Sequence, residues 1–138
     1  MKVYVDSSVV LRRLLLQPGR IENWASWEVA VTSQLTAVES RRSLDRLRVR
    51  GKLADPDMAR LRKVLDATLE QFDVIPVGAA VLERAASAFP TALGTLDAIH
   101  LASALLWIDE KREPLTLLTH DEELAIAAEA SGFAVRGV

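Results

Sequence analysis

Short apolar runs alternate with longer segments of helical character along nearly the whole chain. Parallel strands require long crossover connections, usually helices, so this alternation favours a parallel α/β sheet flanked by helices. The apolar runs predict strands at residues 2–5, 29–32, 72–77, 115–118 and 133–135. The segments between them predict helices at residues 7–16, 20–27, 34–51, 55–71, 78–89, 96–109 and 122–131. We therefore expect one α/β domain spanning residues 1–138, with a central sheet of about five strands.

Capping residues and helix breakers mark where several of these helices begin and end. Ser33, Asp55 and Thr95 each lie at the start of a predicted helix and are suitable N-caps. Pro56 follows Asp55 in the first helical position, where proline is favoured. Gly132 is the expected stop of the last helix.

The composition indicates a folded protein, and the pattern of apolar runs gives no sign of export. Hydrophobic residues make up 50% of the 138 residues, which is enough for a buried core. The chain has no cysteine, which excludes disulfides, thiolate metal sites and cysteine nucleophiles. No apolar run reaches the length of a membrane span, and the N-terminus lacks the pattern of a signal peptide. We expect a cytoplasmic location and no membrane partner.

Positive charge gathers in the middle of the chain, although the formal net charge is −2. Residues 41–63 contain nine Lys or Arg and three Asp. A local field of this sign attracts polyanions such as RNA more effectively than the net charge suggests. The alternative is an ordinary solvated helix surface.

Four acidic residues, Asp6, Glu39, Asp97 and Asp121, lie beside apolar segments that are far apart in the sequence. Asp6 and Asp121 fall just after predicted strands, and parallel sheets bind ligands beyond the carboxyl ends of their strands. Carboxylates held close together raise one another's pKa, so a converged group would stay partly protonated or bind a cation. Oxygen ligands favour hard ions, which predicts Mg²⁺ or Mn²⁺ rather than Zn²⁺.

The segments around these four residues have a specific order and spacing. They read VDSS at 5–8, TSQLTAVE at 32–39, LDAIHLA at 96–102 and LTHDEEL at 118–124. Together they resemble the motifs of the PIN-domain ribonucleases, and more narrowly those of the VapC-type toxins of toxin–antitoxin pairs. The resemblance covers essentially the whole chain.

This resemblance implies a PIN fold and the activity of a metal-dependent endoribonuclease. The four acidic residues match the catalytic residues of the family, and two of them, Asp6 and Asp97, match its principal Mg²⁺ ligands. Ser8 matches a small polar position that supports the metal and its waters, and Thr119 is expected to orient Asp121. The family also implies an RNA substrate, a cognate antitoxin protein as partner, and a homodimer.

Water activated by a metal ion is the expected nucleophile. Neither His100 nor His120 has an obvious partner for nucleophilic or paired-histidine catalysis, and both are interpreted as core histidines with satisfied hydrogen bonds. Glu39 or Asp121 is expected to orient the water. Because the ribose 2′-hydroxyl takes no part, hydrolysis should leave 5′-phosphate and 3′-hydroxyl ends.

A row of arginines is predicted to lead away from the acidic residues. On a helix, positions 39, 42, 46 and 50 share one face, so Arg42, Arg46 and Arg50 would extend from Glu39. The RNA backbone could follow this row into the metal site. In the alternative, Glu39 pairs with Arg42, and the arginines are solvated or contact the antitoxin.

Two other functions remain open. One is a catalytically silent PIN-fold module that binds RNA or protein, against which the presence of all four acids counts. The other is a phosphatase or phosphoacceptor domain with an aspartate nucleophile. Such phosphatases need a second Asp two positions after the first, where this chain has Ser8.

Overall fold

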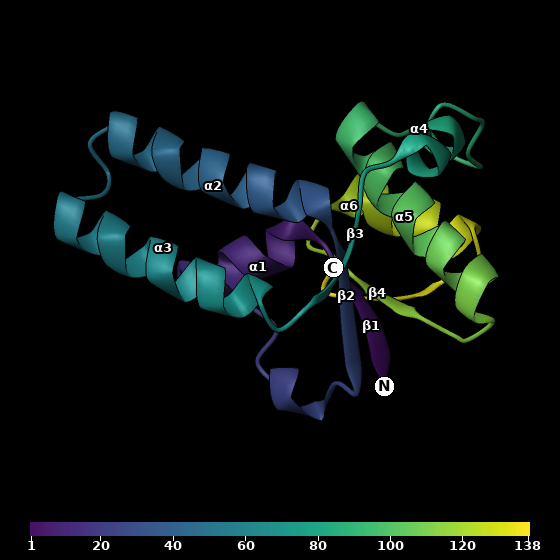
Figure 1. The fold of residues 1–138 in the computed structure, drawn as a ribbon, viewed down its shortest axis with the longest axis horizontal. Helices are drawn as coiled ribbons and strands as arrows, with labels where there is room; N and C mark the ends of the chain where they lie inside the picture. Colours follow the sequence, from purple (N-terminus) through teal and green to yellow (C-terminus); the bar gives the residue numbers. More distant parts are fainter.

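The centre of the structure is a five-stranded sheet in which all neighbouring strands are parallel (Figure 1). The computed structural model describes residues 1–138. Its strands are β1 (Lys2–Val5), β2 (Val29–Ser33), β3 (Asp73–Ile75), β4 (Thr116–Leu118) and β5 (Ala134–Arg136). They lie side by side in the order β3-β2-β1-β4-β5. The predicted parallel α/β sheet of five strands is therefore confirmed.

β1 lies in the middle of the sheet because its side chains are apolar on both faces. Val3, Tyr4 and Val5 are fully buried, as is typical of a parallel strand covered by helices on both sides. β2 and β4 flank it, and the amide of Asp6, just past its end, donates to the Leu118 carbonyl of β4 over 3.0 Å. The carboxyl ends of these strands therefore meet at one edge of the sheet.

Six α-helices cover the sheet: α1 (Ser7–Leu14), α2 (Gln34–Val49), α3 (Asp55–Leu69), α4 (Ala79–Ala85), α5 (Thr95–Lys111) and α6 (Glu122–Ala130). Val3 and Val5 pack in one core cluster with residues of α1, α2 and α3. Tyr4 belongs to a second cluster, which α5 and α6 complete. No helix combines the length and the apolar surface that a membrane span requires.

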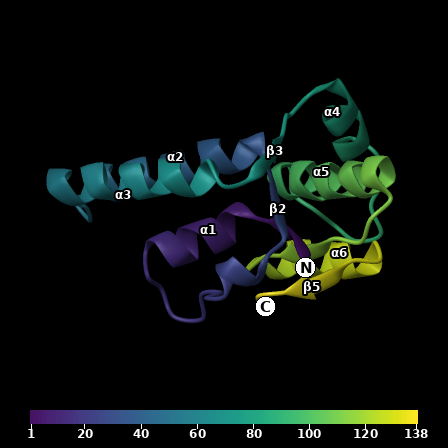
Figure 2. The same ribbon diagram turned by 60° about the horizontal axis from the view of Figure 1, so that its bottom comes forward.

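α2 and α3 form a long helical hairpin that projects beyond the sheet (Figures 1 and 2). Its inner face is apolar, since Leu44, Leu61 and Leu65 are buried there. All nine basic residues of the segment 41–63 are exposed on its other faces. We call this hairpin, residues 34–69, the basic arm.

Two of the predicted helices differ from the structure. Residues 20–27 contain only a short 3₁₀ turn, Trp24–Ser26. Trp24 and Trp27 stack on each other with ring centroids 4.8 Å apart, so their side chains hold a compact loop rather than one face of a helix. α4 is also shorter than the predicted helix at 78–89.

The helix starts agree with the sequence in one case and differ in two. Ser33 caps α2 as predicted, because its hydroxyl accepts an amide proton from the first turn. Ala54 rather than Asp55 is the N-cap of α3, and Gly94 rather than Thr95 is that of α5. Each predicted cap lies one residue further on, inside the first helical turn.

Candidate active site

Asp6 begins the candidate site at the carboxyl end of β1. It is the N-cap of α1 and is almost fully buried. Its Oδ1 accepts from the Ser7 amide over 2.7 Å, and its Oδ2 accepts from the hydroxyls of Ser8 and Thr119 over 2.5 and 2.9 Å. These bonds fix the orientation of the carboxylate and leave Oδ1 able to accept a further contact.

Thr119 and Ser8 connect Asp6 to the loop that follows β4. The buried Thr119 hydroxyl donates to Asp6 and accepts from the Asp121 amide over 3.0 Å. The Ser8 hydroxyl accepts from the His120 amide over 2.9 Å. Both hydroxyls are therefore placed to orient the Asp6 carboxylate and the backbone that carries Asp121.

Asp121 and Asp97 lie at the starts of two helices. Asp121 is the N-cap of α6, and Asp97 lies half-buried in the first turn of α5. Burial, together with the negative charges of Asp121, Asp6 and Glu39, raises the pKa of Asp97 to about 6. The structure therefore gathers the four predicted acidic residues at one edge of the sheet.

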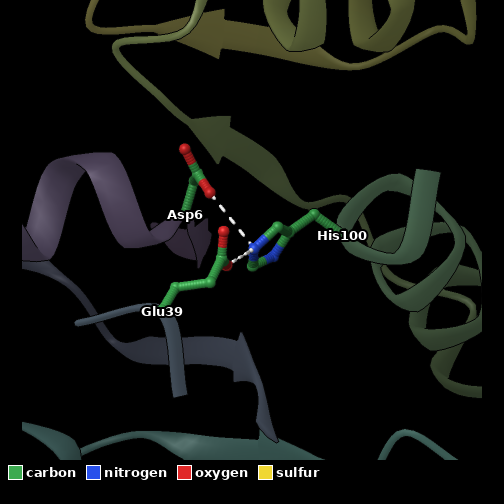
Figure 3. A group of neighbouring side chains, drawn as sticks. All are labelled: Asp6, Glu39 and His100. Carbon is green, nitrogen blue, oxygen red and sulfur yellow. Dashed lines mark hydrogen bonds and ion pairs between the residues drawn. The ribbon is translucent and has the colours of Figure 1, made fainter. Parts of the chain in front are cut away.

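Glu39 and His100 complete the cluster from α2 and α5 (Figure 3). His100 Nε2 lies 2.6 Å from Glu39 Oε1 and 3.4 Å from Asp6 Oδ1. On the other side of the ring, Nδ1 lies 2.8 Å from the Tyr4 hydroxyl. Burial by itself lowers the pKa of His100, but the hydrogen bond to Glu39 and the charge of Asp6 outweigh it, so the pKa is raised. A protonated imidazole would offset part of the carboxylate charge.

The interpretation of the two histidines is only partly right. His100 is buried and hydrogen-bonded, as predicted, but one of its partners is the predicted site residue Glu39, 61 residues away in the sequence. One signal was available, because His100 lies three residues after Asp97 and such residues share a helix face. His120 Nδ1 lies 2.6 Å from the Gly137 carbonyl, whereas its Nε2 is buried without a partner.

The donor set suits a divalent metal ion. Asp6 and Glu39 each offer one carboxylate oxygen, and these two atoms and one ring nitrogen of His100 lie within 4.8 Å of one another. Carboxylate oxygens suit Mg²⁺ and Mn²⁺, and the crowded negative charge favours binding of a cation. Asp97, predicted with Asp6 as a principal ligand, lies outside this tight group, as does Asp121.

A groove between α1 and α2 leads away from Glu39. It consists of two adjoining hollows of about 380 and 400 Å³. Arg42 and Arg46 line the first hollow together with Glu39, and Arg46 and Arg50 line the second together with Arg12. The predicted arginine row therefore borders a groove that reaches the acidic cluster.

The contacts of the row do not support a pair between Arg42 and Glu39. Arg42 lies 3.0 Å from Asp45 instead, and Glu39 contacts His100. All three arginines of the row are exposed. Their charges are therefore accessible to a ligand in the groove.

Comparison with known proteins identifies the family. Residues 3–130 match the family model described as PIN domain. The chain belongs to the PIN domain family. This PIN domain is 31% identical over 138 residues to Ribonuclease VapC47 of Mycobacterium tuberculosis (strain CDC 1551 / Oshkosh), a match that covers 95% of the chain and 93% of the relative. It is 32% identical over 140 residues to Ribonuclease VapC35 of the same strain, with 96% and 94% covered.

A solved structure shares the fold of this PIN domain. It is a toxin-antitoxin complex from Klebsiella pneumoniae, with a TM-score of 0.61 over 90% of this chain and 91% of that chain. Its sequence identity of 19% limits the likeness to the fold. The two ribonucleases, with higher identity over nearly the full length, place the PIN domain among the VapC-type members of the family.

Removing the charge of Asp97 should stabilise the metal-free protein at neutral pH. Folding raises the pKa of Asp97 from 3.8 to about 6, so the folded state binds the carboxyl proton more tightly than the unfolded state does. The free energy of unfolding therefore falls as the pH rises between these two pKa values. In EDTA, Asp97→Asn should be more stable than the wild type by about 1 kcal/mol at about pH 7 and by almost nothing at about pH 4. The difference at about pH 7 is kept small because partial exposure to solvent screens the charges. Urea unfolding measures both values. A difference that does not change with pH would contradict the gathering of charge around Asp97.

Proposed function

We propose that this PIN domain is a metal-dependent endoribonuclease and the toxin of a toxin–antitoxin pair. Its relatives VapC47 and VapC35 are ribonucleases, and a protein of the same fold is part of a toxin-antitoxin complex. The observation that carries the proposal is the acidic cluster, in which Asp6 lies beside Glu39 and the pKa of Asp97 is raised to about 6. Such a cluster is costly unless a cation balances it.

Asp6 and Asp97 would hold a Mg²⁺ ion, with Mn²⁺ as a substitute, and Glu39 and Asp121 would complete the site. When bound, the ion acidifies a water molecule and neutralises charge that develops on the phosphoryl oxygens. Asp6 offers the ion a ligand that is already oriented, because two hydroxyl groups hold its Oδ2. Less reorganisation is then needed when the ion binds.

The side chains around the cluster favour water as the nucleophile. The chain has no cysteine, and the Ser8 hydroxyl is engaged by Asp6 and by the His120 amide. Glu39 and Asp121 are only partly buried, so either can orient a water molecule or accept its proton. Attack by water breaks the bond between phosphorus and the 3′-oxygen, which leaves a 5′-phosphate and a 3′-hydroxyl.

RNA is proposed to reach the site along the groove between α1 and α2. The carboxylates alone would repel the RNA backbone, and the arginines of the groove compensate for this repulsion. Arg42, Arg46 and Arg50 border the groove over its length. Guanidinium groups bind phosphate oxygens through paired hydrogen bonds and release counterions from the RNA.

The cognate antitoxin and a second copy of this chain are the proposed protein partners. A hollow of about 290 Å³ between α1, the 3₁₀ turn and α3 is lined by Leu16, Trp24 and three arginines. Glu22 pairs with Arg20, one of the three, and the remaining positive charge suits an apolar and acidic peptide segment. A second hollow, of about 480 Å³ between α4 and α5, is lined by Leu106 and Trp107 and suits a homodimer contact. The two hollows share no residue, so one partner need not exclude the other.

The purified protein, freed of any bound antitoxin, should cut cellular RNA only when Mg²⁺ or Mn²⁺ is present. Asp97→Asn should lower the cleavage rate by about a hundredfold or more, because it removes a proposed metal ligand. Mapping the ends of the products should give 5′-phosphates and 3′-hydroxyls. A product with a 2′,3′-cyclic phosphate would refute attack by water. Binding of RNA without cleavage by the clean wild type would favour the silent module instead.

Neutralising the arginine row should weaken RNA binding and flatten its dependence on salt. In an Asp97→Asn background, which keeps the RNA intact, the triple variant Arg42→Gln, Arg46→Gln and Arg50→Gln should lower the slope of log affinity against log salt by about two for single-stranded RNA. Fluorescence anisotropy with a labelled RNA measures this slope.

A matched control changes the same number of charges on the basic arm outside the groove. Arg41 and Arg48 pair with Asp66 and Asp45, and Arg62 lies on α3. Replacing these three arginines by Gln should change the slope less than the first triple does. Equal slopes would show that RNA responds to the overall charge of the arm and not to the groove.

A further inference from the structure

His100 forms a hydrogen-bonded chain between the core and the acidic cluster. Its ring is fully buried, and its two nitrogens contact the Tyr4 hydroxyl of β1 and the Glu39 carboxylate of α2. Figure 3 shows the ring of His100 facing both Glu39 and Asp6. The chain thus connects the central strand of the sheet to a carboxylate on the basic arm.

The two carboxylates that His100 faces differ in how they are held. Asp6 accepts hydrogen bonds from the Ser7 amide and from two hydroxyl groups, so its orientation does not require His100. Glu39 is partly exposed, with 21% of its side chain accessible, and His100 is its only hydrogen-bond partner. Without that contact, repulsion by Asp6 would favour rotamers that point Glu39 into solvent.

The hydrogen bonds of the ring indicate a donor role for Nε2. A carboxylate can only accept, so Nε2, 2.6 Å from Glu39 Oε1, carries the proton, and in the neutral ring Nδ1 then accepts from the Tyr4 hydroxyl. A protonated ring also carries a proton on Nε2. In either case Nε2 donates to Glu39 and has no lone pair for a metal ion.

We propose that Tyr4 and His100 are positioning residues that hold Glu39 beside Asp6, so that both carboxylates face the metal ion together. The inference rests on the proposed function, because it concerns the metal site of that function. In this proposal His100 does not bind the metal ion itself, although one of its ring nitrogens lies within 4.8 Å of carboxylate oxygens of Asp6 and Glu39. Residues that orient metal ligands in this way commonly change metal affinity by about tenfold to a hundredfold when they are replaced.

Two amide variants of His100 separate the two nitrogens of the ring. In His100→Gln the side-chain amide can reach the position of Nε2 and donate to Glu39. In His100→Asn the shorter amide can reach only the position of Nδ1, so the contact with Tyr4 is kept and that with Glu39 is lost. Both variants are neutral amides, so a difference between them reports on the Glu39 contact.

Mn²⁺ affinity, measured by isothermal titration calorimetry on the RNA-free protein, is the main readout. His100→Asn should weaken Mn²⁺ binding by about tenfold or more, and His100→Gln should stay within about threefold of the wild type. Tyr4→Phe should lie between them, because it frees the ring without removing the donor. An equal loss in both His100 variants would show that His100 is itself a ligand, and no loss in either would show that it only fills the core.

A stability control separates misfolding from loss of positioning. Leu101 is fully buried next to His100 in the sequence, so Leu101→Val should lower Tm and leave Mn²⁺ affinity unchanged. A matching loss of affinity in Leu101→Val would overturn the proposal, because general destabilisation would then explain the His100→Asn result.

Failure of the inference and failure of the proposed function give different results. If the wild type binds no Mn²⁺, or if Asp97→Asn binds it equally well, the proposed metal site is wrong. If the wild type binds Mn²⁺ and Asp97→Asn does not, the His100 variants test positioning alone. Nitrogen NMR of the Mg²⁺-loaded wild type then provides a direct check: a protonated Nε2 supports positioning, and an unprotonated Nε2 would overturn it.

Discussion

Negative charge collected at one edge of the sheet is the constraint on which the rest of the site depends. Parallel strands end at the same edge, so β1 and β4 bring Asp6 and the loop of Asp121 together. The first turn of α5 and the second turn of α2 add Asp97 and Glu39. Burial and these like charges raise the pKa of Asp97, and the carboxylates would separate unless hydrogen bonds or a cation held them. The hydroxyls of Ser8 and Thr119, His100 and the proposed metal ion all counter this repulsion.

The site combines a rigid half with an adjustable half. Asp6 is buried and held by groups from α1 and from the loop after β4. Glu39 is partly exposed on the basic arm and depends on His100 alone. Because α2 also carries Arg42 and Arg46 of the groove, one helix links the surface proposed for RNA to the metal site. A movement of α2 would therefore change substrate binding and metal geometry together.

The features that the sequence predicted are those set by local chemistry. An apolar run followed by Asp6 predicts a strand that ends in a carboxylate, and Ser33 marks a helix start by its own hydroxyl. The environment of His100 could not be predicted in this way, because its partners come from β1 and α2 and meet only when these elements pack against α5. The prediction of a helix at residues 20–27 is wrong for a similar reason, since stacking of two tryptophans outweighs the local preference for helix.

The gathered carboxylates are proposed to form one cation site at the carboxyl edge of the sheet. Anomalous diffraction from crystals grown with Mn²⁺ tests it most directly, because the signal locates the ion without any assumption about activity. We expect a strong peak within bonding distance of carboxylate oxygens from Asp6 and at least one other residue of the cluster. An Mn²⁺ peak elsewhere on the molecule, with none at this edge, would contradict it.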